Sequence, residues 1–208
     1  MRVSGGEAAS DLPQGRLGFG TVTPEDGPSR LLLEEVAVLV SDPALSLDEV
    51  EIRQAEARDA AAVRGLLADL VRTVTDAGTC GSSVDDILRY GFGDTPHFEA
   101  LIAEASEDPV GLVLFFYNYS TWRGRLGIYV QDIHVVERFR GLGLGRKLLA
   151  AAARRGRARG CTHLRLSVDP GNETALAFYR RLGLEVRRDE AICQVADLAF
   201  DQFAESSW

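Results

Sequence analysis

The sequence predicts an α+β fold, and three observations point to it. An alternating segment typical of a strand comes before a segment with a helical apolar stripe. Three strand-like segments then follow one another, as in an antiparallel meander. The rest of the chain alternates between helical and extended patterns around a glycine-rich stretch. Strands in succession, followed by strand–helix–strand alternation, indicate one mixed sheet with helices packed on it.

The predicted domain begins with a strand over residues 51–55 and continues into a helix. Asp59 can cap this helix at its N-terminus. Its apolar stripe is formed by Val63, Leu66, Leu67, Leu70, Val71 and Val74. Ser83 followed by Asp86 resembles a capping box, which predicts a second, short helix over about residues 85–90.

The remaining elements follow from turn signals and apolar runs. Residues 98–105 and 110–117 form a predicted hairpin, because a polar Ser-Glu-Asp-Pro segment separates two apolar runs. The later elements, in order, are a strand over 127–136, a helix ending near 159, a strand over 163–168, a helix over 173–182 and a final strand over 192–198. Gly183 is the predicted stop of the last helix.

The length of 208 residues fits one domain with an extension. Residues 1–49 are predicted to be an N-terminal extension that is partly flexible, because their first half is rich in Gly, Pro and Ser and has no regular period. Residues 50–208 are predicted to form the domain that carries the function.

Charge, apolar runs and cysteines exclude several classes of protein. The net charge of −8 argues against nucleic acid as the main partner and suits a cationic small molecule. The longest apolar run, residues 110–117, is far shorter than a membrane span, and no secretory leader pattern is present, so the expected location is cytoplasmic. Cys80, Cys161 and Cys193 are widely spaced, and neither a disulfide framework nor a metal site is predicted.

A glycine-rich segment between a strand and a helix is the strongest functional signal. Gly141, Gly143 and Gly145 let backbone N–H groups approach an anion closely, and the start of the following helix adds its positive end. Such a site suits phosphate groups. By spacing alone, the segment is equally compatible with a plain turn before an amphipathic helix.

Two motifs together resemble the GNAT acetyltransferase superfamily. The first is Arg140-x-x-Gly143-x-Gly145, and the second is Asn172 with Tyr179 seven residues later. The resemblance covers about residues 50–208. It implies the GNAT fold, an α+β domain whose mixed central sheet splays after the fourth strand and is flanked by helices, and it implies an N-acetyltransferase.

The same resemblance implies acetyl-CoA as the co-substrate and no metal. It places the pyrophosphate on the loop and the acyl arm along the backbone of the preceding strand, so the expected cofactor-binding residues are Ile133, His134, Val135, Arg140, Gly141, Leu142, Gly143, Leu144, Gly145, Arg146, Asn172 and Tyr179. Tyr179 is the expected catalytic acid, which protonates the departing thiolate. An alternative role for Tyr179 is that of a core aromatic residue beside Leu176 and Leu182.

Within the superfamily, the sequence is most similar to the spermidine/spermine (diamine) N-acetyltransferase-like branch. The segments 91–96, 115–117, 119–124 and 128–132 carry this similarity, which also implies a homodimer. Where that branch usually has an acidic residue, this chain has Gln131. The expected substrate-binding residues are Gln131, Asp132 and Glu190.

The predicted function is acetyl transfer from acetyl-CoA to the primary amine of a small, polyamine-like or amino-acid-like molecule by direct attack. An alkyl ammonium must first lose its proton, and Asp132, His134, Glu190 or a chain of waters could accept it. The alternatives are a protein lysine or N-terminal acetyltransferase, and an acyl-CoA-binding sensor without turnover.

Overall fold

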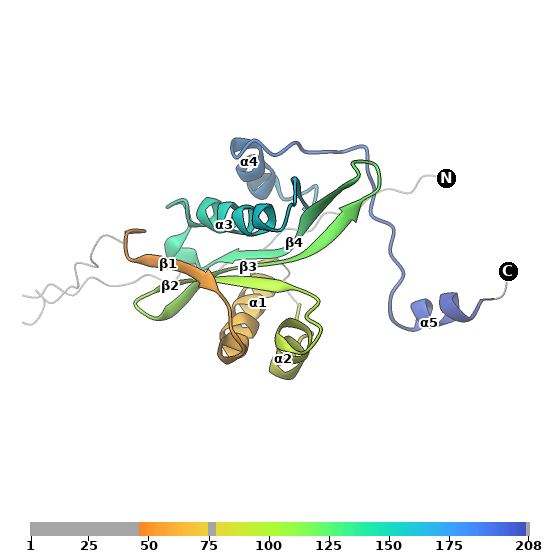
Figure 1. The fold of residues 1–208 in the computed structure, drawn as a ribbon, viewed down its shortest axis with the longest axis horizontal. Helices are drawn as coiled ribbons and strands as arrows, with labels where there is room; N and C mark the ends of the chain where they lie inside the picture. Colours follow the sequence, from red (N-terminus) through yellow and green to blue (C-terminus); the bar gives the residue numbers. More distant parts are fainter. Residues whose placement is uncertain (1–45, 75–77, 207–208) are drawn as a thin grey trace, which may run out of the picture. The chain divides into compact units, whose positions relative to one another are not determined.

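The centre of the domain is a mixed five-stranded sheet (Figure 1). The computed structural model describes residues 46–74 and 78–206, so most of the predicted extension lies outside the described residues. The strands lie in the order of the chain: β1 (Val50–Gln54), β2 (Glu99–Ala105), β3 (Asp108–Ser120), β4 (Arg125–Val135) and β5 (His163–Leu166). Neighbours from β1 to β4 are antiparallel, and β4 and β5 are parallel. The predicted α+β class and mixed sheet are confirmed.

Helices cover both faces of the sheet. The described helices are η1 (Ala57–Asp59), α1 (Ala60–Val74), α2 (Val84–Phe92), η2 (Glu137–Phe139), α3 (Leu144–Ala158), α4 (Glu173–Arg181) and α5 (Asp197–Glu205), and α5 has no buried residue. Figure 1 shows α1 and α2 on one face, with α3 and α4 on the other. Across residues 46–74 and 78–206, none of the helices has the length and apolar character that crossing a membrane requires.

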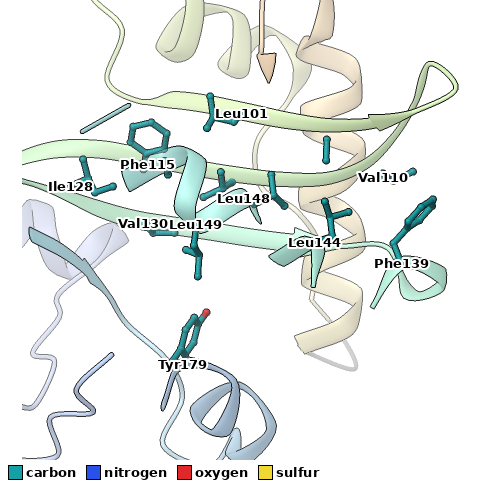
Figure 2. Packing of buried hydrophobic residues seen from close by; sticks show 13 residues of the cluster. Leu101, Val110, Phe115, Ile128, Val130, Phe139, Leu144, Leu148, Leu149 and Tyr179 are labelled. Atoms are coloured by element: carbon teal, nitrogen blue, oxygen red, sulfur yellow. The ribbon is translucent and has the colours of Figure 1, made fainter. Parts of the chain in front are cut away.

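Two apolar clusters, one on each face, hold these layers together. On the α1 face, Val63, Leu66 and Leu67 pack against the sheet as predicted, whereas Val74 at the end of the stripe is 58% exposed. On the α3 face, the buried side chains are Leu101, Ala103, Val110, Val113, Phe115, Ile128, Val130, Phe139, Leu144, Leu148, Leu149, Ala152 and Tyr179 (Figure 2). Side chains alternate between the two clusters along each strand because successive residues point to opposite faces.

The predicted local signals at α2 and at the hairpin are present. The Ser83 hydroxyl accepts from the Asp86 amide, and the Asp86 carboxylate accepts from the Ser83 amide, so the predicted capping box is confirmed. The β2–β3 turn is tighter than predicted, since β3 already begins at Asp108. Its two turn residues, Ser106 and Glu107, both have positive φ, as a type I′ hairpin turn requires.

A bulge in β4 decides which side chains face which layer. Phe115 of β3 pairs with Val130, but the preceding Leu114 pairs with Asp132, so Gln131 is the extra residue. The bulge places Asp132 and His134 on the α1 face, while Ile133 and Val135 pack on the α3 face. The side chains of Asp132 and His134 therefore lie on the same face of the sheet.

The predicted final strand over residues 192–198 is wrong. Residues 185–196 form neither helix nor strand, and the helix α5 begins at Asp197. An isolated strand is unstable without a partner, and no described strand pairs with this segment. Its apolar side chains, which suggested a strand, are instead exposed, with Ile192 at 76% and Leu198 at 69%.

Arg53 of β1 joins two carboxylates from different elements. Its guanidinium donates to both oxygens of Asp59 at 2.7 and 2.8 Å and to both oxygens of Glu104 at 2.7 and 2.6 Å. Asp59 is only 8% exposed, and the bond from Arg53 lowers its pKa to about 2. One guanidinium from β1 thus links the carboxylates of η1 and β2.

Replacing Arg53 with Met is expected to lower the free energy of unfolding by about 2–4 kcal/mol, because Asp59 and Glu104 lose their shared counter-charge. Urea denaturation at pH 7 measures this change. Arg58→Gln is the control, because its pair with Glu56 is 72% and 62% exposed and should contribute less than about 1 kcal/mol. Equal losses in the two variants would contradict the prediction.

Candidate active site

The glycine-rich loop presents a row of free backbone amides. Gly141 and Gly143 have φ of 78° and 93°, a left-handed conformation that glycine adopts without strain. Among the described residues, none accepts a hydrogen bond from the amides of residues 141–146, and the first bond of the helix runs from the Lys147 amide to the Gly143 carbonyl. A site of six unpaired donors at the start of a 15-residue helix fits a diphosphate.

The Arg140 side chain turns back onto the protein. Its Nε donates to the Val135 carbonyl at 2.9 Å, and its Nη2 lies 3.4 Å from the Thr73 hydroxyl at the end of α1. The loop is therefore joined to β4 and to α1. The Arg140 side chain, predicted to bind the cofactor, thus holds the loop in place in this structure. The side chain of Arg146, also predicted to bind the cofactor, is exposed beside the free amides.

Strands β4 and β5 separate beside this loop. Their last paired residues are Val130 and Leu166, and β4 continues to Val135 with no described strand paired on that side. The backbone of Ile133 and His134 therefore borders an unpaired stretch of strand, as the predicted sheet that opens after its fourth strand requires. An extended ligand can add to such an edge.

Tyr179 lies beside this opening. Asn172 caps α4 by accepting from the Ala175 amide at 3.0 Å, and Tyr179 lies two turns further along the same helix. Figure 2 shows the Tyr179 ring extending from α4 toward the α3-face cluster, with its hydroxyl directed inward. The residue is 8% exposed, and its burial raises the pKa of the hydroxyl, which therefore stays protonated at neutral pH.

The three predicted substrate-binding residues occupy different surroundings. Gln131, the bulge residue, is exposed, whereas Asp132 is half-buried and its burial raises the pKa of the carboxyl group. Glu190 lies in the segment after α4 and forms ion pairs with Arg165 of β5 and with Arg187. The structure thus places Gln131 and Asp132 at the opening and brings Glu190 to β5 through Arg165.

Arg165 and Thr73 were not predicted as site residues. Leu164 and Leu166 pack on the α3 face, so Arg165 and Ser167 face the other side, where the Ser167 hydroxyl is 2.7 Å from the Tyr129 hydroxyl. The alternation of His-Leu-Arg-Leu-Ser in the sequence could have assigned Arg165 to this face. No sequence signal links Thr73 to Arg140, because 67 positions separate them.

His134 is a buried histidine between β4 and α1. It is 5% exposed, and its pKa is lowered, first by burial and then by Arg140 and Arg72, while Asp69 acts in the opposite direction. The folded protein therefore keeps His134 neutral. Its backbone can still border the opening, but its side chain packs in the layer between the sheet and α1.

This environment predicts a loss of stability in mild acid. Below the unfolded-state pKa of about 6.5, the unfolded chain binds a proton that folded His134 does not, so the free energy of unfolding falls as the pH drops from 7 to 5. The contribution cannot exceed about 1.4 kcal/mol per pH unit. Replacing His134 with Phe should flatten this slope in urea denaturation series, whereas His97→Gln, at an exposed histidine, should leave it unchanged.

Within residues 46–74 and 78–206, no group of three His, Cys, Asp or Glu side chains is placed to hold a metal ion. The opening is bordered by backbone amides, a buried phenol and a half-buried carboxyl group. This set can bind a diphosphate, donate one proton and accept another.

Comparisons with known proteins agree with this arrangement. A profile of the acetyltransferase (GNAT) family matches residues 69–184. A thialysine N-epsilon-acetyltransferase from Bos taurus is 33% identical over 144 residues, which cover 65% of this chain and 84% of the relative. A spermidine/spermine N(1)-acetyltransferase-like protein 1 from Homo sapiens is 28% identical over 145 residues, or 66% of this chain and 21% of that protein.

A solved structure of an aminoglycoside N-acetyltransferase in complex with CoA has the same fold. Its TM-score is 0.58 at 23% identity, and the alignment covers 72% of this chain and 95% of that one. The alignment thus extends over most of the described domain.

Proposed function

Since the chain belongs to the acetyltransferase (GNAT) family and is an N-acetyltransferase, we propose that it transfers the acetyl group of acetyl-CoA to the primary amine of a small molecule by direct attack. The observation that carries this proposal is the row of free amides at residues 141–146 beside the opening where Tyr179 lies. One relative is named for acetyl transfer to thialysine, and the other is named for its likeness to a spermidine/spermine enzyme. Both names support a small amine as the acceptor.

The residues of the loop and of β4 would hold acetyl-CoA. Backbone amides of Gly141, Leu142, Gly143, Leu144, Gly145 and Arg146 would bind the diphosphate. The unpaired edge of β4 at Ile133 and His134 would bind the acyl arm as an added strand. Bound there, acetyl-CoA supplies a thioester whose carbonyl an amine can attack.

Asp132 is the proposed acceptor of the amine proton. An alkyl amine has a pKa near 10.4, so freeing its lone pair at pH 7 costs about 4–5 kcal/mol. The raised pKa makes the Asp132 carboxylate a stronger base than an ordinary aspartate, and the residue lies next to the bulge. Gln131 has no basic group, and the His134 side chain is buried against α1.

Tyr179 is the proposed acid for the thiolate that departs. Its burial keeps the hydroxyl protonated, and its oxygen forms no hydrogen bond elsewhere in the described chain, so the proton is available. The proposed base and acid therefore lie on opposite faces of the sheet: Asp132 accepts a proton on the α1 face, and Tyr179 donates one on the α3 face.

A thiol-release assay with purified protein, acetyl-CoA and a panel of primary amines tests the proposal. Amine-dependent release at a rate well above hydrolysis is expected. Gln131 specifically favours a second candidate, an acyl-CoA-binding sensor, because it replaces a group that could bind or deprotonate an amine. Tight CoA binding without amine-dependent release would favour that sensor.

A homodimer and a cytoplasmic location are part of the proposal. The segment after α4 exposes Ile192, Leu198, Phe200 and Phe203, and apolar surface of this kind marks contact sites. Light scattering should give twice the chain mass, and changing Phe200 and Phe203 together to Ser should reduce it to the monomer. Cys80, Cys161 and Cys193 are free thiols, which suits a reducing compartment.

A further inference from the structure

An ion pair of opposite charges lies on the acceptor side of the opening. Arg165 is one residue before the last paired position of β5, and its guanidinium contacts the Glu190 carboxylate. The pair lies on the face opposite α3, whereas the loop amides and Tyr179 belong to the α3 side. A second molecule approaching the thioester from across the sheet therefore meets Arg165 and Glu190.

Stability does not account for this pair. The Arg165 and Glu190 side chains are 61% and 45% exposed, and exposed pairs contribute at most about 1 kcal/mol. The neighbouring Arg187 differs, because Asp189 holds its guanidinium through two bonds of 2.9 and 2.6 Å. Arg165 and Glu190 are thus the charges at this position that a ligand can replace at little cost.

We propose that the acceptor is an amino acid with a side-chain amine, whose carboxylate binds Arg165 and whose α-ammonium binds Glu190. The inference rests on the proposed function. The carboxylate of the amino acid would take the place of the Glu190 carboxylate on Arg165, and its α-ammonium would take the place of the Arg165 guanidinium on Glu190. Guanidinium and carboxylate match in shape and form charge-assisted hydrogen bonds, so Arg165 selects for the carboxylate.

The spacing along the sheet fits such a molecule. Arg165 pairs with Tyr129, and Asp132 lies three residues further along β4 on the same face, one of them the bulge. With about 3.3 Å per residue along β4 and about 4.8 Å across to β5, the backbones of Arg165 and Asp132 are roughly 8–11 Å apart, which an extended lysine-length molecule and the two side chains can span. Its head group would lie at Arg165 and its terminal amine beside Asp132.

A polyamine fits the same face less well. Both of its ends are cationic, so one end would meet the like charge of Arg165. Gln131 adds no negative charge at the bulge to offset this repulsion.

In the reaction, the side-chain nitrogen forms a bond to the acetyl carbon, and the carbon–sulfur bond breaks. The ammonium proton goes to Asp132, the thiolate takes the proton of the Tyr179 hydroxyl, and the second proton that the nitrogen loses as the amide forms restores that hydroxyl. Charges are balanced without another reactant, and the head group stays unchanged on Arg165 and Glu190.

Three acceptors that differ only in the head group test the inference: L-lysine, cadaverine, which lacks the carboxylate, and 6-aminohexanoate, which lacks the α-amine. For the wild type, kcat/KM should be highest for lysine. Arg165→Gln should lower kcat/KM about 10- to 100-fold for lysine and 6-aminohexanoate and less than about twofold for cadaverine. Glu190→Gln should lower it for lysine and leave 6-aminohexanoate unchanged.

Arg187→Gln is the matched control, because it removes an arginine that also lies near Glu190, at 3.8 Å, but is held by Asp189. It should leave all three values unchanged. Equal losses for lysine and cadaverine in Arg165→Gln would overturn the inference, as would a wild type that prefers cadaverine, and both results leave the proposed function intact. Absence of thiol release with every primary amine would instead overturn the proposed function and this inference with it.

Discussion

Replacing Gly143 with Asp is expected to abolish acetyl-CoA binding while the domain stays folded. Gly143 has φ of 93° at the start of α3, and a Cβ there would meet no atom within 4 Å. The variant is therefore strained by about 1–2 kcal/mol at the backbone but causes no clash. Its carboxylate would place a negative charge among the amides that bind the diphosphate, and affinity should fall at least about 100-fold. Calorimetric titration with acetyl-CoA measures this.

Gly160→Asp separates the effect of charge from that of backbone strain. Gly160 follows the other end of α3, has φ of 82° and likewise has open space around a Cβ. It should share the small loss of stability and keep its affinity for acetyl-CoA. A Gly143→Asp variant that binds as tightly as Gly160→Asp would place the diphosphate elsewhere.

Replacing Tyr179 with Phe is expected to lower kcat about 10- to 100-fold at pH 7 without changing the affinity for acetyl-CoA. A thiol has a pKa near 8.5, so protonating the departing thiolate is worth about 2 kcal/mol at pH 7. The ring still fills its place in the α3-face cluster, because only a hydroxyl without a hydrogen bond in the described chain is removed. Steady-state kinetics and titration together measure both quantities.

The defect of Tyr179→Phe should shrink above about pH 8.5, since the thiolate can then leave without a proton. Burial raises the pKa of Tyr179, so the wild type keeps its acid over this range. Tyr117→Phe is the control, because its buried hydroxyl likewise forms no hydrogen bond among the described residues, and Tyr117 pairs with Ile128, away from the unpaired edge of β4 at Ile133 and His134. A pH-independent defect, or equal defects in both variants, would remove Tyr179 from the mechanism.

Most elements could be predicted because their signals are local. The capping box of Ser83 and Asp86, the apolar stripe of α1 and the stop at Gly183 each depend on residues a few positions apart. The final strand could not be predicted in this way, because a strand exists only with a partner. Residues 192–198 have an apolar pattern typical of a strand, but no described strand pairs with them. The boundary near residue 50 stays a prediction.

The sequence by itself determined the glycine loop, the Asn172 cap and the position of Tyr179 on its helix, because hydrogen bonds and backbone angles within one or two turns produce them. Only the tertiary structure decided that Gln131 is a bulge, that Asp132 faces α1, that Arg140 joins α1 to β4, and that Arg165 meets Glu190. These features depend on strand register and on contacts between residues that are 15 to 67 positions apart. Such contacts form only when the whole sheet has assembled, so a local pattern in the chain does not encode them.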